Sequence, residues 1–211
     1  PENFEMSDQI AHANLCGFGK SVIQAVLEGK AEKLVLVNCC DSMRRVYDIV
    51  ESTGKCKFLY MLDIPHDDES CEKIKFAASI LRLKEAYENY SGKTFDKSLF
   101  LKAFEQKDTE NQPYIGVLGV RVSGVLEQMI RENIQMNVKN LTCTGGRRLA
   151  VIPKDLQKME EEAMFLAYAD TLLCQMPCFR MNNSTRRNRL YLDPYLKGII
   201  YHTIKFCDYY G

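Results

Sequence analysis

The sequence lacks several features that would point directly to a function. No apolar run approaches the roughly 18 residues that a membrane-spanning helix needs. Lys plus Arg and Asp plus Glu both number 28 among the 211 residues, so the formal net charge is zero. A dedicated nucleic-acid binder usually has a basic excess. The first residues, Pro-Glu-Asn-Phe-Glu, have neither the basic nor the apolar part of a signal peptide. We therefore expect a soluble, cytoplasmic protein that binds neither membrane nor nucleic acid.

Two nucleotide-binding signatures are also incomplete. Residues 17–21, Gly-Phe-Gly-Lys-Ser, are similar to the end of a Walker A loop, but the first glycine of that motif would fall at Asn14. Gly116, Gly119 and Gly124 do not have the spacing of a dinucleotide fingerprint. We expect no ATP site in this chain.

Nine cysteines are present, an odd number that argues against a disulfide framework in a chain without an export signal. No compact Cys-x-x-Cys occurs, and Cys174 and Cys178 have no second pair with which to bind zinc. Free cysteines are commonly small buried hydrophobic residues, and this is the expectation for Cys39, Cys56, Cys71 and Cys174. A subset of the nine could instead supply the soft thiolates that iron–sulfur clusters and zinc prefer.

Strand and helix patterns alternate along the chain. Residues 33–40 and 58–64 are short apolar runs typical of strands buried on both faces, and Pro65 ends the second. Residues 68–90 have the apolar stripe of a long helix, which Ser91-Gly92 should end. The polar residues 105–113 suggest a linker.

After this linker the alternation begins again. The expected strands are 114–120, 137–143 and 198–207, and the expected helices are 123–135, 153–174 and 186–196. Such alternation favours an α/β fold with two small, doubly wound parallel sheets. We therefore predict a first domain at 1–107 and a second at 108–211.

Three cysteines have similar predicted surroundings. Cys40 and Cys207 each end an expected strand, and ligands bind outside the carboxyl ends of parallel strands. Cys16 comes just before an expected helix, whose N-terminus stabilises a thiolate. Spacing alone, however, defines no metal motif.

Five segments resemble motifs of one family. They are 14–21 (Asn-Leu-Cys-Gly-Phe-Gly-Lys-Ser), 38–48 (with Cys-Cys-Asp-Ser-Met-Arg-Arg), 60–66 (Tyr-Met-Leu-Asp-Ile-Pro-His), 176–181 (Met-Pro-Cys-Phe-Arg-Met) and 198–208 (ending Phe-Cys-Asp). In this order they resemble the 2-hydroxyacyl-CoA dehydratase/benzoyl-CoA reductase family. The resemblance implies two flavodoxin-like (Rossmann-like) domains and a 4Fe–4S cluster bound by three cysteines. Matched motif by motif, these are Cys16, Cys40 and Cys207.

The resemblance also implies an activity and partners. Three thiolates leave one iron of the cluster open to a substrate oxygen. Members of the family pass one electron to an acyl-CoA thioester, and the resulting ketyl radical expels a hydroxyl group. The resemblance thus implies an oxygen-sensitive lyase of anaerobic metabolism. An ATP-dependent iron–sulfur activator protein supplies the electron, and the second subunit is a homologous partner or another copy of the chain.

Two alternatives stay open. In a double-cubane branch of reductases further cysteines hold a second cluster, and Cys143 and Cys178 are weaker candidates for that role. Residues 119–123, where another such cysteine is expected, contain none, which favours a single cluster. The chain also looks abbreviated beside its family, which motivates a second alternative, a non-catalytic subunit that keeps the fold.

Further expectations concern single residues. Arg180, Arg186, Arg187 and Arg189 are expected on a solvated helix face, with CoA phosphates or the activator as the alternative contact. His66 is expected to cap a helix or lie at the surface. Neighbouring side chains of a strand point to opposite faces, so Cys40 is expected to bind the cluster while Cys39 packs into the core.

Overall fold

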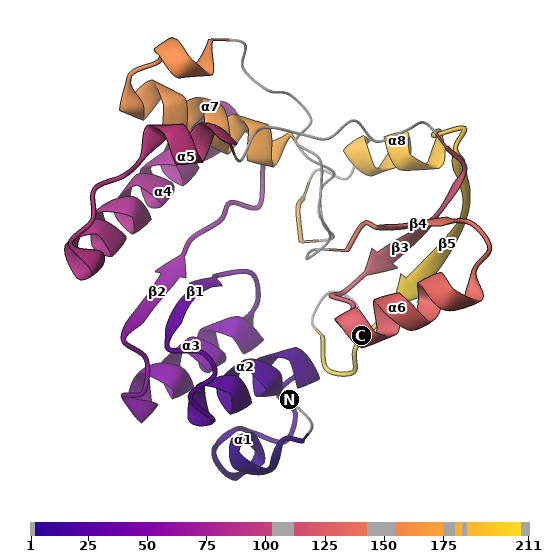
Figure 1. Ribbon diagram of the computed structural model, residues 1–211, viewed down its shortest axis with the longest axis horizontal. Coiled ribbons are helices and arrows are strands. Elements are labelled where there is room, and N and C mark those ends of the chain that lie inside the picture. Colours follow the sequence, from indigo (N-terminus) through magenta and orange to yellow (C-terminus); the bar gives the residue numbers. More distant parts are fainter. Residues whose placement is uncertain (1–2, 103–111, 143–154, 175–179, 183–184, 208–211) are drawn as a thin grey trace.

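The computed structural model describes residues 3–102, 112–142, 155–174, 180–182 and 185–207 (Figure 1). The strands are β1 (Lys33–Val37), β2 (Phe58–Leu62), β3 (Tyr114–Gly119), β4 (Asn137–Asn140) and β5 (Leu196–His202). The helices are α1 (Glu5–Ile10), α2 (Gly17–Leu27), α3 (Asp41–Thr53), α4 (Ser70–Ser91), α5 (Lys97–Lys102), α6 (Gly124–Asn133), α7 (Glu161–Leu173) and α8 (Asn188–Tyr191), with short 3-10 helices η1 (Leu156–Lys158) and η2 (Thr185–Arg187). No helix among these residues is long and apolar enough to cross a membrane.

The first sheet pairs β1 with β2 in parallel, from Lys33 beside Phe58 to Val37 beside Leu62. The connection through α3 is the crossover that parallel strands require. Side chains of α2, α3 and β1 share a buried core, made of Leu15, Ile23, Val26, Leu36, Met43, Val46 and Val50. Both α2 and α3 therefore start close to the carboxyl edge of this sheet.

The second sheet is also parallel, with the order β4-β3-β5. Helix α6 packs on it through Val117, Val122 and Val138, joined by Leu126 and Ile130. Gly119 ends β3 with a φ of 100°, and a β-carbon there would lie 2.0 Å from the carbonyl oxygen of His202. Only glycine tolerates this backbone and this approach, so Gly119 allows the ends of β3 and β5 to meet.

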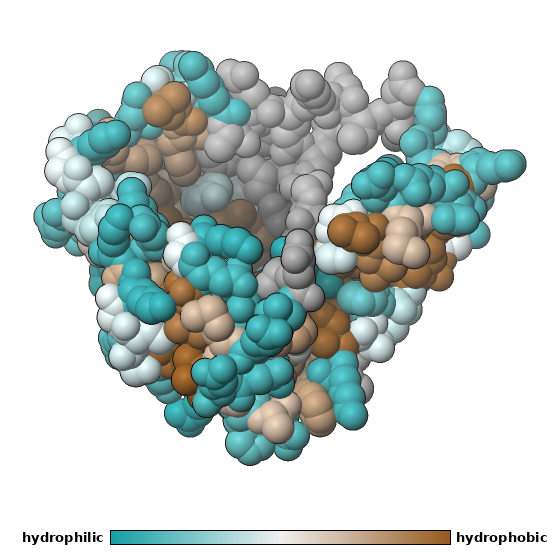
Figure 2. Space-filling view, turned by 60° about the horizontal axis from the view of Figure 1, so that its bottom comes forward, coloured by the Kyte–Doolittle hydropathy of each residue, from teal (hydrophilic) through white to brown (hydrophobic). Residues whose placement is uncertain are grey.

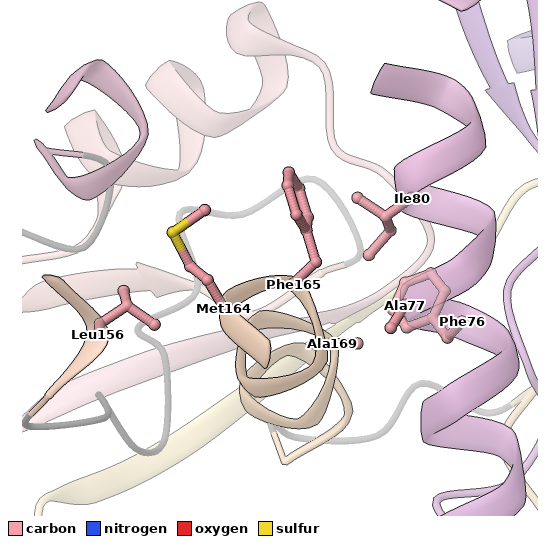
Figure 3. Packing of buried hydrophobic residues seen from close by; sticks show 7 residues of the cluster. All are labelled: Phe76, Ala77, Ile80, Leu156, Met164, Phe165 and Ala169. Atoms are coloured by element: carbon pink, nitrogen blue, oxygen red, sulfur yellow. The ribbon is translucent and has the colours of Figure 1, made fainter. Parts of the chain in front are cut away.

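A third core lies between α4 and α7, which are far apart in sequence (Figure 1). Figure 3 shows Phe165 and Ala169 on the side of α7 that faces Phe76, Ala77 and Ile80 of α4. Phe95 and Phe100 extend this core, each with its ring about 5 Å from that of Phe165. The packing of α7 on α4 crosses the expected boundary at residue 107, and the two-domain division stays a prediction.

The two parallel sheets confirm the α/β class, while flavodoxin-like domains stay a prediction. Gly92 ends α4 with a φ of 67°, as its sequence indicated. Several expected ends are wrong, since β1 ends at Val37, β2 at Leu62 and β5 at His202. Helix α7 begins at Glu161 rather than near Pro153, because a 3-10 turn precedes it. Pro153 and most of the expected linker lie outside the described residues.

Candidate functional site

Cys16 is the N-cap residue of α2, as expected from the sequence. Its Sγ accepts a hydrogen bond from the backbone N–H of Gly19 at 3.4 Å, and the residue is buried. A β-carbon at Gly19 would lie 2.9 Å from Val46 of α3. The absence of a side chain at Gly19 thus lets the start of α2 lie close against α3, the helix that begins just after Cys40.

Cys40 caps α3, in a position that the sequence had suggested for Asp41-Ser42. The strand stops at Val37 because the N–H of Cys39 turns back to the carbonyl oxygen of Val37 at 2.8 Å. Outside the extended strand the alternation of side chains no longer holds. The Sγ atoms of Cys39 and Cys40 lie 4.0 Å apart, so the expectation that the two thiols face opposite sides is wrong.

Cys207 follows β5 after a turn rather than ending the strand. Its N–H donates to the carbonyl oxygen of Ile204 at 3.1 Å, and Phe206 has a φ of 65°. Cys207 is half-buried, as is Cys40.

Cys40 and Cys207 both lie close enough to Cys16 to influence its thiol electrostatically. Burial raises the pKa of the Cys16 thiol above its ordinary value, and the hydrogen bond from Gly19 opposes this. The neighbouring charges of Cys40 and Cys207 raise the same pKa further. The fold therefore brings Cys207 near Cys16, although 191 positions separate the two in sequence.

These thiols do not surround a point that a single ion could occupy. Within the described ranges, no group of three or more His, Cys, Asp or Glu side chains is placed to hold one metal ion. In a 4Fe–4S cluster each cysteine binds a different iron, so its ligands lie farther apart than those of one ion. Three soft thiolates are a donor set that suits an iron–sulfur cluster, and two of them, Cys16 and Cys40, lie at helix starts that favour the thiolate form.

The other cysteines meet the expectation of core packing in part. Cys39 and Cys56 are half-buried and pack against the core of α2, α3 and β1, Cys174 is half-buried, and Cys71 is exposed. The Sγ of Cys174 bonds to Asp170, and burial raises the pKa of Cys56. Cys143 and Cys178 lie outside the described residues.

Arg121, after β3, is a neighbour of the site that the sequence did not indicate. Its guanidinium lies over the ring of Phe18, 5.0 Å from the centroid, in a cation–π contact. Because Phe18 lies two residues after Cys16, this contact brings the loop after β3 to the start of α2. Neither residue belongs to a local pattern that pairs them.

Arg180 is buried, so the expected solvated face is wrong for this residue. Its guanidinium donates to the carbonyl oxygens of Pro65, at 2.7 Å, and of Ile64. Nothing in the described part of the chain bonds its buried Nε. Arg189 is exposed, as expected, whereas Arg187 is half-buried, and the side chain of Arg186 lies outside the description.

The same short segment also holds His66. The Nδ1 of His66 lies 3.0 Å from the carbonyl oxygen of Arg180, and the N–H of Asn182 donates to the carbonyl oxygen of His66 at 2.8 Å. The side chain of Asn182 donates to Asp67 at 2.8 Å. We name residues 180–182 the clamp, since they hold residues 64–67 by backbone and side-chain bonds.

A cavity of about 680 Å³ lies beside the clamped loop. Its lining includes Asp63, His66, Phe76, Ser79 and Arg82. A hydrogen bond of 2.9 Å from the side chain of Asn38 to Asp63 links this lining to the loop that carries Cys40. The volume is within the range of small-molecule sites, and the carboxyl edge of a parallel sheet is their usual position.

The fold and these residues define an α/β protein with thiols at the starts of α2 and α3 and a cavity near the carboxyl edge of its first sheet. Residues 1–113, more than half of the chain, match the family model described as 2-hydroxyglutaryl-CoA dehydratase, D-component. The chain therefore belongs to this family, which confirms the resemblance seen in its motifs. The matched range contains Cys16, Cys40 and His66, whereas Arg180 and Cys207 lie beyond it. A search of curated proteins found no match.

Proposed function

We propose that the chain is the iron–sulfur subunit of an enzyme that dehydrates a 2-hydroxyacyl-CoA, with Cys16, Cys40 and Cys207 as the ligands of a 4Fe–4S cluster. The observation that carries the proposal is the position of Cys16 and Cys40 as the N-cap residues of α2 and α3, two helices whose packing is close where Gly19 meets Val46. Membership in the dehydratase family supports the same assignment.

The chain's own groups prepare these ligands. The N-terminal ends of α2 and α3 carry a partial positive charge that favours the thiolates of Cys16 and Cys40. The N–H of Gly19 donates to Cys16 and holds its sulfur in place. When bound, the cluster would supply one electron and an open iron to the thioester of the substrate.

Partners follow from the same proposal. The sequence has no complete P-loop, so a separate ATP-dependent iron–sulfur activator would provide the electron. A homologous subunit or a second copy of the chain would complete the enzyme. Figure 2 shows apolar surface on the lobe that carries α6, where Val125 and Met129 are 73% and 55% exposed. Apolar surface of this kind supports contact with a partner.

Iron analysis of anaerobically purified and reconstituted protein tests the proposal. We expect about four irons per chain, with broad visible absorption. Twice that amount would favour the double-cubane alternative. Cys16→Ser and Cys207→Ser should each lose the iron, whereas Cys71→Ser, at an exposed thiol, should keep it.

Two results would contradict the proposal. Folded wild-type protein that stays free of iron would exclude the cluster. If Cys16→Ser loses its iron while the complex with its partner subunit still forms and stays fully active, the chain serves only as a scaffold in that complex.

A further inference from the structure

His66 has a fixed orientation at the edge of the cavity. The Arg180 carbonyl oxygen, 3.0 Å from Nδ1 of His66, can only accept a hydrogen bond. Nδ1 must therefore carry a proton, and in the neutral ring Nε2 is left as the basic nitrogen. His66 lines the cavity of about 680 Å³.

The clamp bonds to residues that come before and after His66 in the loop, and so holds the imidazole ring in place. The buried guanidinium of Arg180 bonds to Ile64 and Pro65, directly before His66. The backbone N–H of Asn182 donates to the His66 carbonyl oxygen, and its side-chain amide donates to the Asp67 carboxylate.

Dehydration of a 2-hydroxyacyl-CoA requires a base. The C3–H bond and the C2–O bond break, and a double bond forms between C2 and C3. The C3 proton and the departing hydroxide together make one molecule of water. The electron taken up by the thioester is returned at the end, so no net oxidant or reductant is consumed.

We propose that His66 is the base that removes the C3 proton in the cavity beside the first sheet. Nε2 accepts the proton from C3, and the imidazolium then gives it to the departing hydroxide. This inference rests on the proposed function. It adds a catalytic residue and assigns the cavity to the acyl part of the substrate.

The link from Asn38 to Asp63 supports this position for the acyl chain. It joins the cavity to the loop of Cys40 through a hydrogen bond of 2.9 Å. Arg44 completes the link by donating to the Asn38 side chain at 2.6 Å. The loop of Cys40 and the cavity thus lie at the same carboxyl edge of the first sheet.

Replacement of His66 tests the proposal in the reconstituted protein, with any subunit that co-purifies. The assay uses a chemical low-potential reductant and 2-hydroxyglutaryl-CoA as the probe. His66→Gln should keep the wild-type iron content and visible spectrum while dehydration slows about 10²- to 10⁴-fold, the usual contribution of a general base. Added imidazole should restore part of the rate to His66→Gly but not to His66→Gln.

His12→Gln is the matched control. His12 is also exposed, but its Nδ1 accepts from the N–H of Asn14 at 3.1 Å and it does not line the cavity. This variant should keep the wild-type rate.

Unchanged dehydration by His66→Gln, or loss of iron together with the rate, would overturn the role of His66. Wild-type protein that carries its cluster but leaves the probe unchanged would overturn the proposed function, and this role with it.

Discussion

The Sγ atoms of Cys39 and Cys40 lie 4.0 Å apart, in a turn that follows the end of β1 at Val37. Two thiols at this separation lie on the same side of the turn, so either sulfur could reach one iron position by a change of side-chain rotamer. The proposed ligand Cys40 thus has a substitute beside it, which an extended strand would have placed on the other face.

We therefore expect Cys40→Ser to keep part of its iron and Cys39→Ala to keep all of it. Cys39→Ala should cost about 1 kcal/mol of stability, as for a small truncation of a half-buried side chain. Only Cys39→Ala/Cys40→Ser should be free of iron. Iron content and the thermal midpoint, measured for the three variants under argon, test this. Complete loss of iron from Cys40→Ser alone would show that Cys39 does not substitute.

The raised pKa of Cys16 predicts a pH dependence of the iron-free protein. A folded-state pKa above that of the unfolded chain contributes stability below the unfolded value, and this is lost as the pH rises through the folded value. The iron-free, reduced protein should become less stable above the ordinary pKa of a free thiol. Urea denaturation from neutral to alkaline pH measures this, and Cys16→Ser should show a flatter profile. An equal slope in both proteins would refute the assignment to Cys16.

Gly119 should not tolerate a side chain. Gly119→Ala places a β-carbon 2.0 Å from the His202 carbonyl oxygen at a φ of 100°, so it should cost about 2–4 kcal/mol through strain and displaced strands. Gly124→Ala is the control, since a β-carbon there meets nothing within 4 Å and alanine favours the helix. Chemical denaturation should show a loss only for Gly119→Ala. Equal stability of the two variants would mean that β3 and β5 can separate without cost.

Arg180 should contribute to stability through the clamp. Arg180→Lys cannot reach the carbonyl oxygens of Ile64 and Pro65 together, and an unpaired buried carbonyl costs free energy, so we expect a loss of about 2–4 kcal/mol. Arg189→Lys, at an exposed position, should change the free energy of unfolding little. A urea titration of both variants decides the matter. A stable Arg180→Lys protein would show that the loop holds its shape without the guanidinium.

Much of the local structure could be predicted from the sequence. The apolar runs at β1 and β2 and the glycine after α4 act over neighbouring residues, and their patterns indicated two small parallel sheets and the end of α4. The start of α2 at Cys16 could be predicted for the same reason. The family followed from motifs, which are also local. Strand ends were less predictable, because a single backbone turn at Cys39 ended β1 before its apolar pattern did.

The sequence by itself therefore determined the α/β class, the family and the cysteines that are candidates for a cluster. Only the tertiary structure decided that Arg180 is buried and bonds to Ile64 and His66, more than 100 positions away. It also decided that Arg121 lies over Phe18. Such partners share no periodicity or spacing along the chain. They meet because parallel strands bring their carboxyl ends to one edge and because helix packing then fixes which loops share the space beyond it.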